Sequence, residues 1–167
     1  ADEYADADGH GDACDSCPAS PNPGFSRCAA TIYEVKTGAV SGPVFLPNVL
    51  VTACAPGGGF FVQHKLGDPA YAGAENSGLY VYRPSTVCGT TVTAGDRLDL
   101  SGTPSVFFMQ IQLGSPSFQT LSSGEAAPTP VALTPAQAAG TMPNAFEGVL
   151  ARVLDVTVTN NNPPPGA

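Results

Sequence analysis

The stretch GDRLDLSG at residues 95–102 alternates apolar and polar side chains at every second position. Leu98 and Leu100 fall on one face of an extended chain, and Arg97 and Asp99 fall on the other. A period of two residues is typical of a half-buried β-strand. We therefore predict a strand here, with its leucines in a core and its charged residues on a solvated strand face or in a turn.

Similar patterns extend to both sides of this stretch, and turns rich in glycine and proline separate them. The run at 107–113 places its odd-numbered apolar residues on one face. In the run at 146–159 the apolar positions change phase once, as they do at a β-bulge. The further predicted strands are 31–35, 44–54, 60–63, 78–82, 107–113 and 146–159.

One short helix is predicted at residues 134–140. Thr134 is a suitable N-cap, a proline occupies the first turn, Gln137 completes a capping box and Gly140 ends the helix. The tail at 160–167 has consecutive asparagines followed by consecutive prolines, so we expect it to be disordered.

The composition favours the same fold class. Glycine and proline supply 36 of the 167 residues, and only 12% of residues are charged. Many short strands joined by turns explain this excess, whereas long amphipathic helices need more charged residues. No run approaches the roughly 20 apolar residues of a membrane span. The prediction is an all-β fold, a small barrel with one short helix.

The first fifteen residues hold six carboxylates and no lysine or arginine. Such a run is usually a solvated tail. Here, however, the oxygen-bearing residues recur at the spacing of a twelve-residue EF-hand-like loop over 4–15, with Gly9 at its sharp turn and Tyr4 in place of the first aspartate. The pattern predicts an irregular loop that binds Ca²⁺. The predicted ligands are the side chains of Asp6, Asp8, Asp12 and Asp15 and the carbonyl of His10.

The chain has five cysteines, an odd number that suggests a missing partner in a secreted protein. Zinc is the competing interpretation for Cys14 and Cys17, but a structural zinc site usually has a second close pair of ligands, which is absent here. Disulfides are the favoured interpretation, and they imply an oxidising compartment.

The segment DADGHGDACDSCPASPNP, residues 6–23, resembles a thrombospondin type 3 repeat and the start of the next one. The resemblance implies calcium binding. It also implies that Cys17 pairs with Cys28 and that the partner of Cys14 lies before residue 1, where neighbouring repeats or subunits could assemble. With Cys17 and Cys28 assigned, Cys54 and Cys88 are the remaining candidates for a second disulfide.

A second resemblance covers about residues 31–159. The segments GFFVQ, SGLYVY, AGDRLDLSGT and FMQIQL are similar to OB-fold domains of bacterial cell-surface lipoproteins and of secreted nucleases. The resemblance implies an OB-fold-like barrel. The stretch AFEGVLARVLDVTVTN resembles the opening strand of a second such unit, so 146–159 either closes the first barrel or begins another.

The predicted organisation is a calcium-binding segment and connector at 1–28, a barrel domain at 29–159 and the disordered tail. The chain opens without a signal peptide, and we expect a mature or trimmed product. It shows no nucleotide-binding or nucleophile motif, and we expect it not to be an enzyme. His64 is expected to be a surface residue on an edge strand.

Two classes of function remain. The first is an extracellular calcium-binding structural or adhesive module at the cell surface, with a protein or a glycan as its partner. The second is an accessory domain of a secreted nuclease or other hydrolase that binds nucleic acid or glycan; a cluster of Lys36, Lys65 and Arg83 beside exposed aromatic residues would favour nucleic acid. Most of the aromatic side chains are expected in the core: Phe60, Phe61, Tyr71, Tyr80, Tyr82, Phe107 and Phe108.

Overall fold

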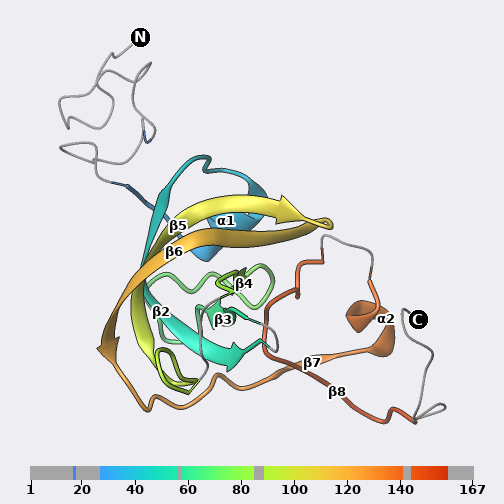
Figure 1. Ribbon diagram of the computed structural model, residues 1–167. Coiled ribbons are helices and arrows are strands. Elements are labelled where there is room, and N and C mark those ends of the chain that lie inside the picture. Colours follow the sequence, from blue (N-terminus) through green and yellow to red (C-terminus); the bar gives the residue numbers. More distant parts are fainter. Residues whose placement is uncertain (1–16, 18–26, 56–57, 85–88, 141–143, 158–167) are drawn as a thin grey trace.

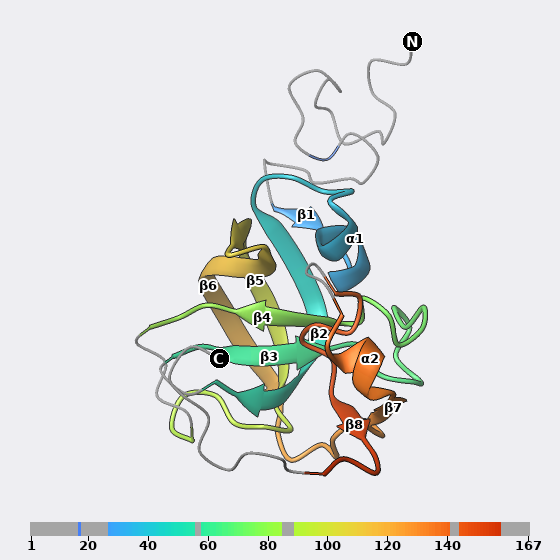
Figure 2. The same cartoon turned by 90° about the vertical axis from the view of Figure 1, so that its right-hand side faces the viewer.

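The computed structural model describes residue 17 and residues 27–55, 58–84, 89–140 and 144–157 (Figures 1 and 2). None of the described helices is long and apolar enough to cross a membrane. In chain order the described elements are β1 (Cys28–Ala29), α1 (Ile32–Thr37), β2 (Val44–Cys54), β3 (Phe60–Gln63), β4 (Gly78–Val81), β5 (Arg97–Phe107), β6 (Gln110–Ser122), β7 (Val131–Leu133), α2 (Pro135–Ala138) and β8 (Ala151–Val153).

Five of these strands close a small barrel. Their order is β2, β3, β4, β6 and β5, and β5 pairs back with β2 to complete the ring. The pairing between β4 and β6 is parallel, and the other four barrel pairings are antiparallel. The predicted all-β barrel is confirmed, and the predicted strands at 44–54, 60–63 and 78–82 correspond to β2, β3 and β4.

The hydrophobic core lies inside this barrel and consists largely of side chains at alternate strand positions. Leu98 and Leu100 of β5 are fully buried, as their alternation predicts. Helix α1 adds Ile32 and Val35 to the same cluster. The remaining buried members are Ala30, Val44, Leu46, Val49, Val51, Phe60, Val62, Leu79, Val81, Val92 and Leu113.

The turn that leads into β5 explains the glycine and aspartate before it. Gly95 has a φ of +94°, and a Cβ at this position would lie 2.7 Å from the backbone oxygen of Glu125. Any residue other than glycine is therefore disfavoured here for two reasons: the positive φ and the clash of its Cβ with the backbone of Glu125. Asp96 accepts hydrogen bonds from the backbone nitrogen and hydroxyl of Thr93, at 2.8 and 3.0 Å, and so stabilises the turn.

The predicted strand at 31–35 is wrong, because this segment forms helix α1. Thr31 and Glu34 make a reciprocal capping box, and Gly38 ends the helix in a left-handed conformation with a φ of +73°. The five-residue run fits strand and helix periodicity equally well, since Ile32 and Val35 are three residues apart and both face the core. The capping residues decide between the two.

The run at 107–113 is a hairpin turn and not one strand. Strand β5 continues to Phe107, Phe108 and Met109 form a two-residue turn, and β6 returns from Gln110. The sequence carries no sign of this turn, because Asn and Gly, the residues that favour it, are absent. Figure 1 shows the hairpin crossing the barrel with its turn at the right-hand end.

The last elements lie outside the barrel. Helix α2 has Thr134 as N-cap and a capping box with Gln137, as predicted, although Ala139 and not Gly140 is its C-cap. In the described part of the predicted strand at 146–159, which ends at residue 157, only β8 forms, and it pairs in parallel with β7 in a separate two-stranded sheet. Because β2 and β5 close the barrel, β8 does not; a second unit beginning at 146–159 stays a prediction.

Candidate functional site

A row of large polar and aromatic side chains crosses the outer face of three barrel strands. The pairing register places Phe61 of β3 opposite Tyr80 of β4, and Tyr80 opposite Gln112 of β6. The chain neighbours of Phe61 and Tyr80, among them Phe60 and Leu79, are fully buried. Gln112 is 9% exposed and follows the partly buried Ile111. Since successive residues of a strand point to opposite faces, the row faces outward.

These side chains line a cavity of about 420 Å³, which we call the aromatic cleft. The rings of Phe61 and Tyr80 are 5.2 Å apart and tilted by 44°. The Tyr80 hydroxyl donates a 2.6 Å hydrogen bond to the carbonyl oxygen of Gly58, so this ring is held in place. Burial raises the pKa of Tyr80, which therefore stays neutral. The residues of the cleft are Ala55, Phe61, Tyr80, Tyr82, Phe107, Gln110 and Gln112.

The aromatic cleft carries hydrogen-bonding groups but no charged residue in its described lining. The amide nitrogen of Gln112 lies 3.4 Å from the hydroxyl of Ser105 on the neighbouring strand. Tyr82 keeps 45% of its surface exposed and Phe107 keeps 58%, so both rings are available to a ligand. The cleft suits a neutral molecule with flat apolar faces and polar edges.

The expectation that most aromatic residues are core is wrong. Of the seven considered, Phe60 is buried, Phe61, Tyr71 and Tyr80 are partly exposed, and Tyr82, Phe107 and Phe108 are exposed. In a strand of a closed barrel every second residue must point away from the core. The adjacent pair at 60–61 and the alternation at 80 and 82 were the signals that could have revealed the outer face.

Arg97 corrects a second expectation, because it is buried and not on a solvated face. Its guanidinium contacts both oxygens of Asp68, at 2.7 and 3.0 Å, and both oxygens of Glu125, at 2.6 and 2.7 Å. Asp96 is also buried, at 4% exposure. The hydrogen bonds from Arg97 and Lys65 lower the pKa of Glu125 to about 2. This cluster holds strands and loops together, since its charged groups are paired with one another.

His64 is likewise buried, at 2% exposure, and the expected surface position is wrong. Its Nε2 accepts a hydrogen bond of 3.3 Å from the backbone nitrogen of Ile32, and its ring stacks on Tyr33 with the centroids 5.9 Å apart. Burial lowers the pKa of His64, and Arg97 acts in the same direction while Asp68 opposes it. The neutral ring therefore supports the start of α1.

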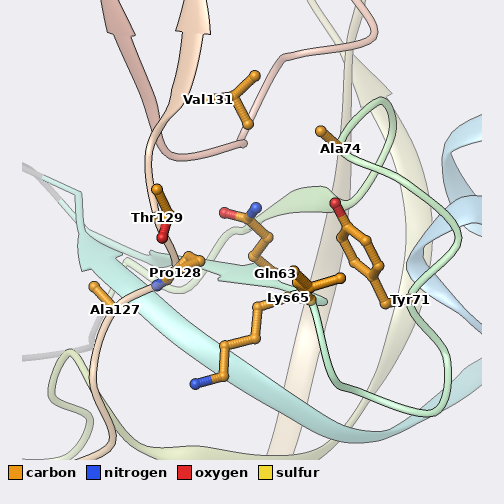
Figure 3. Close-up of a pocket in the computed structure, with 9 residues that line it drawn as sticks. Gln63, Lys65, Tyr71, Ala74, Ala127, Pro128, Thr129 and Val131 are labelled. Atoms are coloured by element: carbon orange, nitrogen blue, oxygen red, sulfur yellow. The ribbon is translucent and has the colours of Figure 1, made fainter.

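A second cavity, of about 340 Å³, lies between the end of β3 and the segment before β7 (Figure 3). The Gln63 amide at its base donates to the Ser77 hydroxyl at 3.2 Å and accepts from the Leu150 backbone at 3.0 Å. Lys65 binds the carboxylate of Glu125. Because these groups serve contacts within the chain, the cavity is a weaker candidate than the aromatic cleft.

The predicted calcium ligands Asp6, Asp8, His10, Asp12 and Asp15 lie outside the described residues, as does Cys14. The part of the chain that the structure describes contains no group of three or more His, Cys, Asp or Glu side chains arranged for a metal ion. The calcium site stays a prediction.

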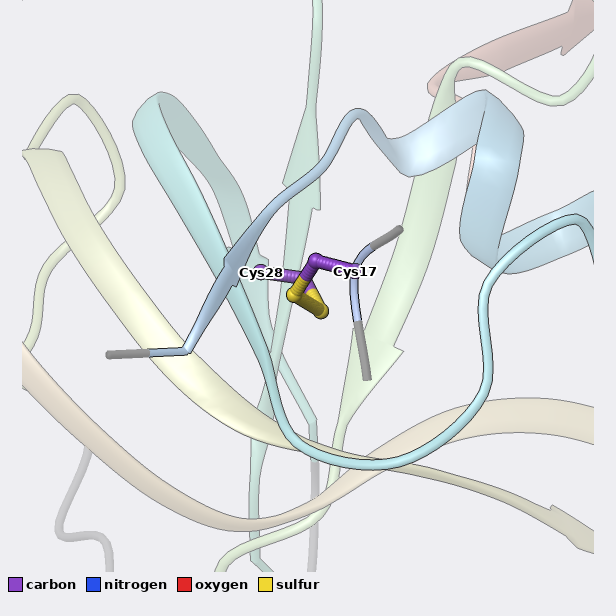
Figure 4. The surroundings of a disulfide bond; sticks show 2 residues. All are labelled: Cys17 and Cys28. Carbon is purple, nitrogen blue, oxygen red and sulfur yellow. A yellow bond between two sulfur atoms is a disulfide. The ribbon is translucent and has the colours of Figure 1, made fainter. Parts of the chain in front are cut away.

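The structure contains the disulfide between Cys17 and Cys28, with Cα atoms 5.5 Å apart (Figure 4). Cys28 begins β1, which pairs with β2 at Val44. Cys54 is also disulfide-bonded, but Cys88 lies outside the described residues, so the pairing of these two stays a prediction.

Searches of family models, of curated proteins and of solved structures find no match to this chain. A functional assignment therefore rests on the geometry of the described residues. The protein is a small closed β-barrel with an uncharged, aromatic-lined cleft on its outer face.

Proposed function

We propose that this protein is an extracellular, non-catalytic binding module that holds a neutral glycan in its aromatic cleft. In the same proposal, the acidic segment at 1–28 binds Ca²⁺ and serves as a structural element before the barrel. The observation that carries the proposal is the row formed by Phe61, Tyr80 and Gln112, with Tyr82 and Phe107 exposed beside it.

The position of the cleft in the barrel supports this proposal. OB-folds are five-stranded Greek-key barrels that bind oligonucleotides and oligosaccharides on their second and third strands and in the loops between strands one and two and strands four and five. Counted from β2, the second and third barrel strands are β3 and β4, which carry Phe61 and Tyr80. Ala55 adjoins the first of these loops, and Phe107 and Gln110 flank the second.

The chemistry of the lining favours sugars. Apolar faces of sugar rings pack against aromatic rings, and side-chain amides both donate to and accept from sugar hydroxyls. Gln110 and Gln112 supply such amides at one side of the cleft. A neutral glycan requires no cation, which agrees with the uncharged lining.

Nucleic acid is the second candidate, and the cations argue against it. Binding a phosphate backbone requires a positive groove beside the stacking rings. Lys36 is only 1% exposed and pairs with Glu147 at 3.0 Å, and Lys65 pairs with Glu125. Arg83 lies over the Phe118 ring, 5.1 Å from its centroid. The register of β3 and β4 places Lys65 and Arg83 at opposite ends of this strand pair, so the cluster with Lys36 that would favour nucleic acid does not form.

The extracellular assignment is supported by the cysteines. Disulfides persist in oxidising compartments, and both Cys28 and Cys54 are disulfide-bonded. The bond from Cys17 to Cys28 also ties the end of the predicted calcium segment to the first strand, which suits a structural role for that segment.

Titration with a panel of neutral oligosaccharides, followed by calorimetry, tests the proposal. We expect the Tyr82→Ala variant to bind its best ligand about tenfold more weakly, which corresponds to a loss of roughly 1.4 kcal/mol in binding free energy. Tyr82 is exposed, so its removal leaves the core intact. Leu66→Ala is the matched control, because Leu66 is 83% exposed and lines the second cavity and not the aromatic cleft.

Two results would contradict the proposal. One is the absence of binding to every neutral oligosaccharide of a broad panel. The other is binding of single-stranded DNA that weakens steeply with salt and is lost in Tyr82→Ala, which would favour the second candidate.

A further inference from the structure

The closed end of the β5–β6 hairpin is an exposed apolar tip. Phe108 is 87% exposed, Val106 70%, Met109 59% and Phe107 58%. Phe107 and Phe108 pack edge to face, with ring centroids 4.6 Å apart. We call residues 106–109 the hairpin tip. Exposed contiguous apolar residues of this kind mark a surface that another molecule covers.

The backbone conformation of the hairpin tip indicates that these residues have a role other than forming the turn. Phe108 and Met109 have φ values of +46° and +66°. Two-residue turns with positive φ at both positions favour Asn-Gly, because a side chain disfavours this conformation. Two bulky apolar residues here oppose the local stability of the hairpin. Strain of this kind at an exposed site points to a functional contact.

The hairpin residues on both sides of the tip carry no charged side chain. Residues 100–124, which include most of both hairpin strands, contain no Asp, Glu, Lys, Arg or His, although the chain has a net charge of −8. Charged groups are costly to move into lipid, whereas uncharged apolar ones enter it readily. The uncharged end of the hairpin therefore meets the requirement for contact with lipid. Arg27 and Arg83 contact β6 farther along the strand, at Ser117 and Phe118.

The shape of the tip distinguishes lipid from a protein partner. A stable protein interface covers about 800 Å² of each partner, with a polar rim around its centre. Four side chains at the end of one hairpin offer a smaller surface than this. A bilayer needs no complementary shape, so it accepts such a tip.

We propose that the hairpin tip inserts into the interfacial region of a zwitterionic lipid bilayer. The net negative charge of the chain gives no attraction to anionic lipid, so insertion rests on the apolar side chains. This inference goes beyond glycan binding. It shares with that proposal the exposure of Phe107, but the exposure and the positive φ of Phe108 and Met109 support insertion alone. Since Phe107 and Gln110 also line the aromatic cleft, an inserted tip holds the cleft beside the membrane surface.

The absence of tryptophan from the chain gives a direct test. In the full chain, Phe108→Trp introduces a single reporter at the tip. With phosphatidylcholine vesicles we expect its emission to shift to shorter wavelength and to be quenched by phosphatidylcholine with brominated acyl chains. Leu66→Trp, at a site that is 83% exposed and outside the tip, is the matched control and is expected to show neither effect.

A second variant separates insertion from folding. Phe108→Asn combined with Met109→Gly supplies the preferred turn residues, so it preserves the hairpin while removing two large apolar side chains. We expect its sedimentation with phosphatidylcholine vesicles to fall at least about tenfold, because each lost side chain contributes on that scale.

The proposal is overturned if vesicles do not change the emission of the Phe108→Trp variant, or change it no more than they change the emission of the Leu66→Trp control. It is also overturned if the double variant binds vesicles as well as the natural chain, or if binding occurs only when anionic lipid is present. An emission shift that depends on protein concentration without lipid would instead identify a second copy of the chain as the occupant.

Discussion

At the scale of single residues, two polar side chains that the local sequence predicts at the surface are buried. Arg97 does lie on the outer face of β5, as its alternation predicts, but it is not exposed to solvent. Asp68 and Glu125, which are 29 and 28 residues away in the chain, cover it and bind both edges of its guanidinium. Arginine is suited to this position because its planar fork binds two carboxylates at once. His64, the second of the two, is buried against Tyr33 at the start of α1.

Protonation of His64 gives a prediction about pH. Its pKa lies below the ordinary 6.5 in the folded protein, so the unfolded chain binds the proton more readily. The free energy of unfolding should therefore fall as the pH drops below about 6.5. The lowered pKa values of Glu125 and Asp68 have the same sign and cause a further loss below about pH 4.5.

The two pH ranges can be separated by mutation. His64→Gln keeps an acceptor for Ile32 but does not titrate, so urea unfolding should show a nearly constant stability from about pH 7 to about pH 5. His10→Gln, the change at the other histidine of the chain, should leave the loss below pH 6.5 unaltered. A loss that persists in His64→Gln would assign it to another group.

At the scale of the elements, caps and turns decide what periodicity leaves open. Helix α1 and helix α2 both begin with a capping box, from Thr31 and from Thr134. The two differ in packing, because α1 buries Ile32 and Val35 in the core, whereas α2 buries none of its residues. A helix that packs on the core contributes its capping energy to the whole fold.

This difference predicts unequal costs for the same mutation. Thr31→Ala removes the acceptor for the backbone nitrogen of Glu34 and should lower the free energy of unfolding by about 1 kcal/mol. Thr134→Ala should lower it by less than about 0.5 kcal/mol, because fraying of α2 exposes no core residue. Urea unfolding of both variants measures the difference. Equal losses would show that α1 is no more coupled to the barrel than α2.

At the scale of the whole molecule, distant segments lie against the barrel. Lys36 of α1 pairs with Glu147, and the backbone nitrogen of Asn76 donates to Ala145 at 2.6 Å. At the start of β4, a Cβ on Gly78 would overlap the backbone of Gly148. These contacts hold residues 144–149 on the barrel, independently of the predicted calcium segment at the other end of the chain.

Removal of calcium should therefore have a local effect. In the proposed calcium segment, six carboxylates in the first fifteen residues would repel one another without a cation, and bound Ca²⁺ would stabilise only the ordered loop. We expect a chelator to open residues 1–27 to protease while the barrel from Cys28 onward stays intact. Limited proteolysis read by mass spectrometry measures this, and Asp8→Asn should behave in calcium as the natural chain does in chelator. Digestion of the barrel at the same rate would show that the two parts unfold together.

Elements with local signals were predictable from the amino-acid sequence. Strands β2, β3 and β4, the start of β5 and helix α2 follow from alternation, turn residues and caps, and together they were sufficient to predict a small all-β barrel. Local signals were insufficient for α1, where five residues fit two periodicities, and for the turn at Phe108, where bulky residues occupy a conformation they disfavour. Strand β7, at three residues, is too short to leave a pattern.

Which side chains come into contact depends on long-range strand pairing. Closure of β5 on β2 makes one face of every barrel strand external, and so brings Phe61, Tyr80 and Gln112 into one row from positions far apart in the chain. Asp68 and Glu125 cover Arg97, and the start of α1 covers His64. Alternation in a sequence indicates that the two faces of a strand differ. What covers each face depends on long-range strand pairing, so the aromatic cleft could not be predicted from the sequence.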